Sequence, residues 1–237
     1  MLPLLAVVFV CALVQSVFGV GLLVFGTPAL LLLGYSFPSA LFHLLPCSIL
    51  ISSLQIRDDY GEARGLLRSY LLFLAPAAAA GAALVFLSDK RFDIRAAVGV
   101  MLLLSALLRV SEASRRRLAR VLKPNATAGL TLIGFVHGLT NMGGGLLTAF
   151  VNSLYAEKVA VRAGIALGYL IMAVVQFALV LLLKGPQGSF AEIALLLGLT
   201  MSAYLLLGRK LFTRSPQLVY QHSMTVLMAV CGLMLLR

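Results

Sequence analysis

Apolar residues run along this chain in long blocks separated by short charged joints. The blocks that contain no Asp, Glu, Lys or Arg are residues 2–56, 69–88, 96–108, 125–156, 163–183, 193–208 and 223–236. A helix needs about 20 residues to cross about 30 Å of hydrocarbon, and blocks of roughly this length recur along the whole chain. The pattern predicts an all-α polytopic membrane protein and excludes a soluble enzyme and a secreted disulfide scaffold.

Two of the blocks are too long for a single crossing. Block 2–56 divides at a turn-forming cluster near residues 34–38, which leaves an overlong first unit, and block 125–156 is a second one. Glycines interrupt the two units near their middles, at 19–21 and at 143–145. Because each glycine costs a helix roughly 1 kcal/mol relative to alanine, we expect both helices to break there. Each half then has a glycine-broken re-entrant or half-helix unit followed by three transmembrane helices.

A weak internal repeat supports this division. A shift of about 122 residues pairs Gln15 with His137, Gly21 with Gly143 and, with a slip of one residue, Gln55 with Gln176. The same shift aligns the order of long and ordinary segments. We therefore expect a first membrane repeat at 1–108, a basic cytoplasmic linker at 109–124 and a second membrane repeat at 125–237.

The distribution of Lys and Arg predicts the topology. If every unit crosses once, the two faces receive 11 and 8 basic residues, whereas they receive 14 and 5 if each overlong unit returns to its starting side. The positive-inside rule favours the second arrangement. It gives each half an odd number of crossings, so the halves are two inverted repeats. Both termini are then outside, and the cytoplasmic joints are 57–68, 109–124, 157–162 and 209–222.

The joints and Arg237 together hold all 27 charged residues, so neutral dipoles and histidine must handle a substrate inside the spans. A cation transporter normally places Asp or Glu near the bilayer midplane, and their absence favours an anionic or neutral cargo. A helix that begins after a glycine break presents free N–H groups and a positive dipole end to an anion. The candidate substrate-binding residues are Gln15, Ser16, Gly19, Gly21, Thr27, Gln55, His137, Thr140, Asn141, Gly143, Gly144, Gly145, Thr148, Asn152 and Gln176.

Several polar and small residues also have structural interpretations. Gln55 and Gln176 suit hydrogen bonding between helices as well as substrate contact. His137 suits either a buried core position or proton coupling. Glycine spacing such as that of Gly134 to Gly138 is typical of close helix packing. Arg162 is interpreted as snorkelling to the interface, and steering of anions is the alternative role.

Other classes of function lack support in the sequence. The basic residues flank apolar spans, where they face lipid headgroups, so nucleic-acid binding is not expected. The chain has no metalloprotease, Walker or nucleophile-elbow motif, and we expect no enzymatic activity, no cofactor and no metal. Each of the three cysteines stands alone in an apolar run, as a small buried hydrophobic residue does.

Two short motifs carry a family resemblance. They are Phe18-Gly19-Val20-Gly21 with Pro28 in the first half, and Gly134 to Gly138 with Asn141-Met142-Gly143-Gly144-Gly145-Leu146-Leu147 in the second. Together they resemble the TauE/SafE sulfite exporter family, also called the 4-toluene sulfonate uptake permeases, although Leu22 and Leu23 depart from the usual glycine-rich first motif. The resemblance spans nearly the whole chain. It implies a multi-pass protein of the bacterial inner membrane, with the termini then periplasmic, that moves sulfite, sulfoacetate or other organosulfonates.

The leading hypothesis is a secondary carrier for small sulfur-containing anions, with alternating access around a midplane site. Export is favoured because a membrane potential, negative inside, drives anions outward. The alternative is a channel or facilitator for a small inorganic anion or a neutral solute, and a third reading is a non-transporting membrane subunit. The sequence leaves the particular anion, the coupling ion and the formation of a homodimer open.

Overall fold

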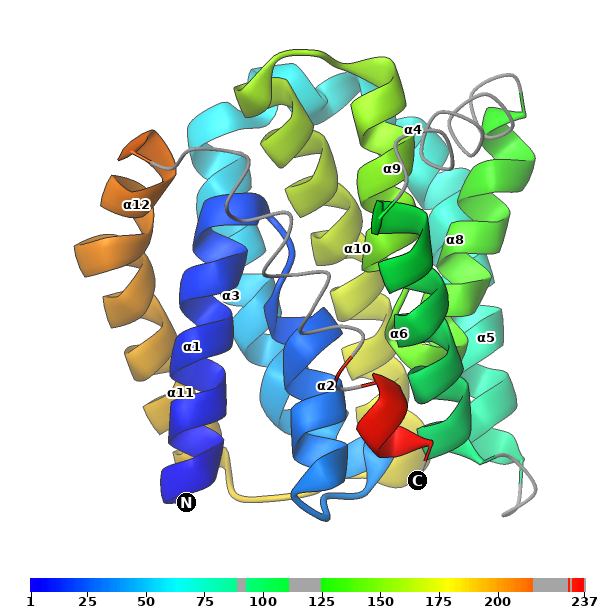
Figure 1. The fold of residues 1–237 in the computed structure, drawn as a ribbon, viewed down its shortest axis with the longest axis vertical. Helices are drawn as coiled ribbons and strands as arrows, with labels where there is room; N and C mark the ends of the chain where they lie inside the picture. The colour runs from blue at the N-terminus through cyan, green and yellow to red at the C-terminus, as the bar shows by residue number, and fades with distance from the viewer. Residues whose placement is uncertain (89–92, 111–124, 215–229, 231, 237) are drawn as a thin grey trace.

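The computed structural model describes residues 1–88, 93–110, 125–214, 230 and 232–236, and the regular elements in these ranges are all helical (Figure 1). In chain order they are α1 (Leu2–Phe18), α2 (Leu22–Leu32), α3 (Phe37–Ala63), η1 (Arg64–Leu66), α4 (Leu67–Ser69), η2 (Tyr70–Leu74), α5 (Ala75–Leu87), α6 (Ile94–Val110), α8 (Ala126–Thr140), α9 (Gly144–Leu154), α10 (Lys158–Lys184), α11 (Phe190–Ala203), η3 (Tyr204–Gly208) and α12 (Arg209–Arg214). Most of the predicted linker at 109–124 and of the last predicted span at 223–236 lies outside the described residues.

Four helical stretches are long and apolar enough to cross a membrane, namely Phe37–Arg57, Gly61–Leu87, Lys158–Lys184 and Phe190–Phe212. Their outer faces carry exposed leucines, such as Leu71, Leu182 and Leu206 at 53%, 79% and 65% exposure. An apolar surface of this kind is costly in water and is matched by lipid tails. The prediction of an all-α polytopic membrane protein is therefore confirmed.

The two overlong units are helical hairpins. The chain rises through α1 and turns back into α2, and it descends through α8 and turns back into α9 (Figure 1). The returning helices α2 and α9 have 11 residues each. Such a helix is about 16 Å long, roughly half of a 30 Å hydrocarbon layer. Each hairpin thus returns towards the end of the bundle from which it came.

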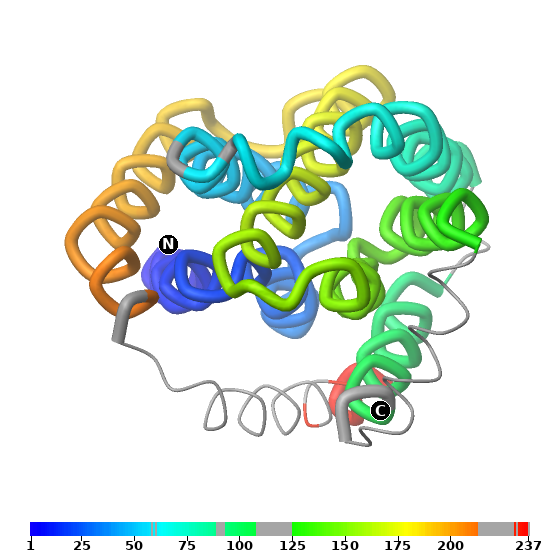
Figure 2. Tube along the Cα trace, turned by 90° about the horizontal axis from the view of Figure 1, so that it is seen from above, coloured from blue at the N-terminus to red at the C-terminus, as the bar shows by residue number. Residues whose placement is uncertain are grey.

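The helices α3 and α10 form the scaffold on which the hairpins lie. Both have 27 residues, and they share the most extensive helix–helix contact in the described part of the chain. Viewed from above, the two hairpins form a row through the middle, with α3, α10 and α5 on one side and α6 on the other (Figure 2). The breaks in the hairpins therefore lie inside the bundle.

The described parts of the joints lie at two opposite ends of the bundle. At one end, Arg162 at the start of α10 forms an ion pair with Asp59 of α3, and Lys158 donates a hydrogen bond to the Phe212 carbonyl at 2.6 Å. At the other end, residues following α2 and α5 and the last residue of α10 line one cavity. The cytoplasmic assignment of the first end, the periplasmic termini and the division into inverted repeats stay predictions.

Arg162 differs from its expected role. Its side chain does not snorkel to the interface, because it is 9% exposed, paired with Asp59 and stacked 3.6 Å from the centre of the Phe212 ring. A carboxylate and an aromatic face supplied by neighbouring helices make this buried position tolerable for a guanidinium. The interpretation of Arg162 as an interface residue was wrong.

Two glycines of α8 permit close packing against α5. A Cβ atom on Gly134 would collide with the Leu74 carbonyl, and one on Gly138 would collide with the Ala78 carbonyl. Backbones can approach this closely only where a side chain is missing. The packing interpretation of this glycine pair is confirmed.

Candidate functional site

Each hairpin turns on a residue with a left-handed backbone conformation. Gly19 ends α1 with a φ of 73°, and Asn141 ends α8 with a φ of 61°. Their N–H groups donate to the carbonyls four residues earlier, at 2.8 Å for Gly19 and 2.6 Å for Asn141. Glycine adopts this conformation freely, and asparagine is one of the few other residues that tolerate it. Both predicted helix breaks are therefore confirmed.

The second break lies slightly earlier in the chain than expected. The glycine triplet predicts unwinding at 143–145, whereas the chain is irregular at 141–143 and already helical at Gly144 and Gly145. The shift has a physical reason, because the left-handed Asn141 ends α8 before the triplet is reached.

The glycine that follows each left-handed residue lets the chain fold back on its own helix. A Cβ atom on Gly21 would lie 2.6 Å from the backbone nitrogen of Gln15, and one on Gly143 would lie 2.6 Å from the Cβ atom of His137. Real Cβ atoms do not approach heavy atoms this closely, so both turns require glycine. The pairs of residues in contact are related by the predicted shift of 122.

Two glutamines hold the ends of the hairpins in the same way. Gln55 of α3 and Gln176 of α10 are fully buried, and each donates its amide N–H groups to two carbonyls in the last turn of a hairpin helix. The acceptors are Gln15 and Ser16 at 3.0 and 3.1 Å for Gln55, and His137 and Gly138 at 3.1 and 3.3 Å for Gln176. The Gln15 and His137 carbonyls also accept the N–H groups of Gly19 and Asn141, so each glutamine adds a second donor to one carbonyl and is the donor to the next one, that of Ser16 or Gly138. The expected equivalence of the two glutamines holds in space.

The first break is sealed by protein atoms. Gln15 donates to the Ser48 and Ser52 hydroxyls at 2.9 and 3.2 Å, and its side-chain oxygen accepts the Leu22 N–H at 3.1 Å. Leu22 and Leu23, at the start of α2, are fully buried. The start of α2 therefore has an internal cap and an apolar cover.

Two further polar candidates of the first half are also paired within the protein. The Ser16 hydroxyl donates to the Ala12 carbonyl at 2.6 Å. The Thr27 hydroxyl of α2 accepts a hydrogen bond at 2.7 Å from the Asn141 side chain. This bond joins the two hairpins at the level of the breaks.

The start of α9 is built differently. The N–H groups of Gly144, Gly145 and Leu146 lie in its first turn and so have no acceptor within the helix. A Cβ atom on Gly144 would overlap the Tyr169 hydroxyl, and one on Gly145 would lie 3.1 Å from the Ser105 hydroxyl oxygen. Gly145 and Leu146 are partly exposed, in contrast to the buried start of α2. Small residues here let the Tyr169 and Ser105 hydroxyls approach the helix start closely.

Polar atoms without a hydrogen-bond partner among the described residues concentrate near these breaks. Both ring nitrogens of His137 belong to this group, as do the side-chain oxygens of Gln55, Asn141 and Gln176. His137 is fully buried, and its ring meets the Tyr169 ring edge to face at 5.8 Å between centroids. An unpaired buried polar group costs about 1–3 kcal/mol, so such a cluster is typical of a site that a guest completes.

The remaining candidates of the second half bond within their own helices. The Thr140 hydroxyl donates to the Val136 carbonyl at 2.8 Å, and the Thr148 hydroxyl donates to the Gly144 carbonyl at 2.7 Å. Asn152 is exposed and donates to the Thr148 carbonyl at 2.7 Å. Asn152 thus lies two turns along α9 from the helix start.

The family model of the sulfite exporter TauE/SafE matches residues 4–235, which include both hairpins and the scaffold helices. The chain belongs to this family. TauE/SafE proteins are membrane transporters named for sulfite export, and the resemblance carried by the two glycine motifs is thereby confirmed. The chain matches no curated protein and no solved structure.

Four residues near the breaks of this TauE/SafE protein are absent from the sequence candidates. Ser48 and Ser52 pair with Gln15, while Ser105 and Tyr169 lie beside the start of α9. Ser48 and Ser52 are four residues apart and so share a helix face. Ser105 is the sole polar side chain in block 96–108, a signal that could have identified it. Tyr169 lies in a long apolar run without such a signal.

Proposed function

We propose that this TauE/SafE protein is a secondary carrier that exports small sulfur-containing anions, such as sulfite, sulfoacetate or other organosulfonates. The site is the start of α9, and access to it alternates between the two sides of the membrane. The observation that carries the proposal is a helix start with unpaired N–H groups inside apolar blocks that contain no charged residue.

The donors at this site match the oxygens of a sulfonate group. A sulfonate or sulfite has three oxygens that share the negative charge, and the N–H groups of Gly144, Gly145 and Leu146 point along one direction at the helix start. The positive end of the helix dipole adds to this attraction. Of the sequence candidates, we assign anion contact to Gly144, Gly145 and Asn141, whereas Gln15, Gln55 and Gln176 hold the hairpins.

Among the proposed cargoes, the acceptor oxygens without a partner near the breaks favour hydrogensulfite, which carries a proton. The amide oxygens of Asn141 and Gln176 accept hydrogen bonds and repel a bare oxyanion. Hydrogensulfite carries one proton, so it can donate to an oxygen on one side and accept from the helix start on the other. His137 is the candidate to take up or release that proton.

The direction of transport follows from the charge of the cargo. A membrane potential, negative inside, favours the exit of a monovalent anion by about 2.3 kcal/mol per 100 mV. Export therefore needs no second ion, whereas uptake against this potential does.

The test is counterflow of labelled sulfite and sulfoacetate in proteoliposomes, with the variant Gly145→Ala. A methyl group 3.1 Å from the Ser105 oxygen crowds the first turn of α9. We expect counterflow to fall about tenfold, the loss that corresponds to one hydrogen bond to a charged oxygen. Gly198→Ala is the matched control, because a Cβ atom on Gly198 meets nothing within 4 Å.

The same assay separates a carrier from the alternative function. A carrier is stimulated by unlabelled anion on the opposite side, and a channel or facilitator is not. Flux without this stimulation would favour the channel. Equal counterflow in the Gly145→Ala and Gly198→Ala proteins would remove the start of α9 from the site.

A further inference from the structure

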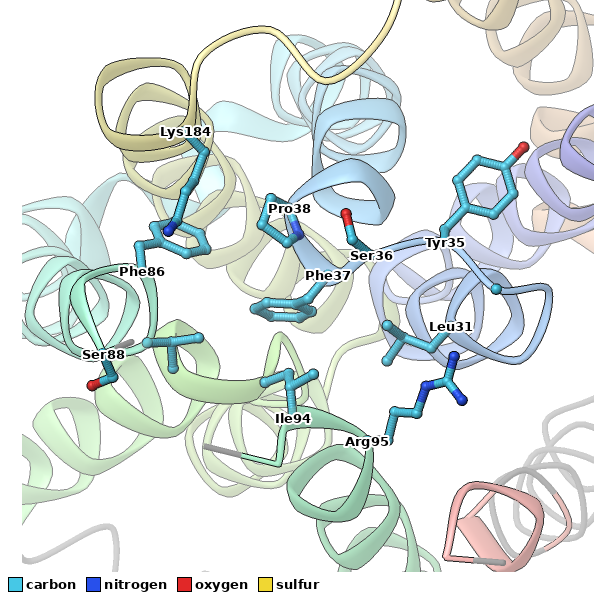
Figure 3. A pocket seen from close by; sticks show the side chains of 12 residues that line it. Leu31, Tyr35, Ser36, Phe37, Pro38, Phe86, Ser88, Ile94, Arg95 and Lys184 are labelled. Atoms are coloured by element: carbon cyan, nitrogen blue, oxygen red, sulfur yellow. The ribbon is translucent and has the colours of Figure 1, made fainter. Parts of the chain in front are cut away.

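One end of the bundle contains a cavity of about 390 Å³, which we call the vestibule. It is lined by the end of α2 and the residues that follow it, by the end of α5, by the start of α6 and by the last residue of α10 (Figure 3). Its volume is within the range of about 300–1,000 Å³ that is usual for small-molecule sites. None of the residues that line it is a sequence candidate for substrate binding.

The vestibule has a positive lining. Arg95 of α6 and Lys184 of α10 lie on opposite sides of it, with Phe37 and Ile94 between them (Figure 3). Among the described residues that line the cavity there is no carboxylate. Two unit charges of one sign around a concave surface raise the local concentration of ions of the other sign. The lining therefore selects for anions.

The carboxylates nearest in the described chain have other partners. Asp93 accepts the Ala96 N–H at 3.0 Å and so caps α6. Glu192 accepts the Ser189 N–H at 3.1 Å and lies 3.7 Å from the His43 ring nitrogen. Neither carboxylate lines the vestibule. Within the part of the chain that the structure describes, no carboxylate of the lining neutralises Arg95 or Lys184.

Two helices connect the vestibule with the hairpin breaks. In α2, Leu22 is bonded to Gln15 at the first break and Leu31 lines the vestibule. In α6, Ser105 lies beside Gly145 and Arg95 lines the vestibule. About ten helical residues separate the two levels, which is about 15 Å. The vestibule therefore lies beyond the start of α9 along the direction of these two helices.

We propose that the vestibule is a second anion site, which receives a sulfite or sulfonate ion after it leaves the start of α9. Arg95 and Lys184 hold the ion by charge. This inference rests on the proposed transport function for the direction of travel. The binding of anions at Arg95 and Lys184 can be tested without transport.

The test uses a cysteine in the vestibule, Ser36→Cys, in liposomes of zwitterionic lipid. Its labelling rate is measured with an anionic sulfonate-bearing methanethiosulfonate and with a cationic one, after subtraction of the labelling of the parent chain. We expect the ratio of anionic to cationic rates to fall about threefold when Arg95→Gln and Lys184→Gln are added, since both nearby charges are removed. The matched control is Arg64→Gln with Arg68→Gln, two exposed arginines near the opposite end of the bundle, and it leaves the ratio unchanged.

Protection of the cysteine from labelling by a free anion shows whether the vestibule binds that anion or a lipid headgroup. Sulfoacetate slows the labelling of Ser36→Cys in the charged protein and has no effect in the Arg95→Gln, Lys184→Gln protein. Slowing that requires anionic lipid and ignores sulfoacetate would show a lipid headgroup site instead and overturn the inference. An unchanged rate ratio in the neutralised protein would also overturn it.

Transport measurements then separate the two proposals. If the wild type shows no counterflow but the labelling results hold, the vestibule binds anions and the carrier function fails. If counterflow is present, we expect the Arg95→Gln, Lys184→Gln protein to need about threefold more anion for half-maximal rate from the vestibule side. If counterflow is normal but the labelling rates do not depend on Arg95 and Lys184, the vestibule is not an anion site and the proposed carrier function still stands.

Discussion

The two helical hairpins share a backbone and differ in what surrounds their returning helices. Gly19 and Asn141 have the same left-handed conformation, and Gln55 and Gln176 hold the two ends by the same bonds. At the start of α2, however, the Gln15 side chain occupies the Leu22 N–H. At the start of α9 the first two residues are glycine, and the nearby Asn141 side-chain oxygen has no hydrogen-bond partner among the described residues.

This contrast separates two requirements of a broken helix. The backbone geometry of the break needs only a left-handed residue, a glycine that folds back and a clamp on the last carbonyls. Whether the break can receive a guest depends on the side chains at the first turn of the returning helix. We therefore regard the first hairpin as a structural counterpart of the second.

The largest effect is expected when the start of α9 receives the side chain that covers the start of α2. Leu22 and Gly144 occupy equivalent positions, so Gly144→Leu copies the sealed arrangement onto α9. The new side chain meets Tyr169 and Val24, and transport should fall about a hundredfold or more because several N–H contacts are covered. Rates in proteoliposomes measure this, with Gly198→Leu as the control on an open helix face.

Overpacking of this kind costs typically 1–3 kcal/mol, so folding is checked by gel filtration and thermal denaturation. A folded Gly144→Leu protein that transports every tested anion at the wild-type rate would favour the reading that the glycines serve packing alone.

A second prediction concerns the shared part of the hairpins. Gln55→Leu and Gln176→Leu each leave one buried carbonyl, that of Ser16 or Gly138, without its donor, so each should lower the free energy of unfolding by about 1–3 kcal/mol. The matched geometry predicts that the two losses agree within about 1 kcal/mol. Chemical denaturation in detergent measures both. A loss confined to one variant would show that the two clamps are not equivalent.

The smallest effects on transport are expected for variants of Gln15 and His137, which are related by the shift of 122 residues. The two variants should differ in kind. The Gln15 side chain bonds to three residues, whereas the His137 ring nitrogens have no partner among the described residues. His137→Ala should flatten the pH dependence of transport, with the rate at the optimum changed by only a few fold. Gln15→Ala should keep the pH profile and lower stability instead. Full activity with an unaltered pH profile in His137→Ala would remove the proton role.

The sequence predicts the fold better than it predicts the site. Uncharged blocks indicate the spans, and the glycines at 19–21 and 143–145 indicate the breaks, because lipid and backbone sterics act on local sequence. The shift of 122 also identifies contacts of the hairpins that recur in space. The position of the second break was missed by two residues, since the left-handed conformation of Asn141 depends on how α8 ends.

What the sequence leaves hidden depends on contacts between distant segments. Ser48 and Ser52 reach Gln15 across more than thirty residues, and Tyr169 reaches Gly144 from another helix. Arg162 and Asp59, which form an ion pair, are even further apart in the chain. A local sequence pattern does not predict which of the spans will pack against one another.

The opposed directions of α2 and α9 have a consequence for the valence of the cargo. Their starts meet inside the bundle, where Val24 lies against Gly144 and Thr27 bonds to Asn141. Each helix start is equivalent to about half a positive unit charge, so the pair offsets roughly one. A head group with one negative charge, such as a sulfonate or hydrogensulfite, is balanced there by backbone alone, whereas sulfate, with two charges on one head group, would keep an uncompensated charge in a low-dielectric layer and is disfavoured.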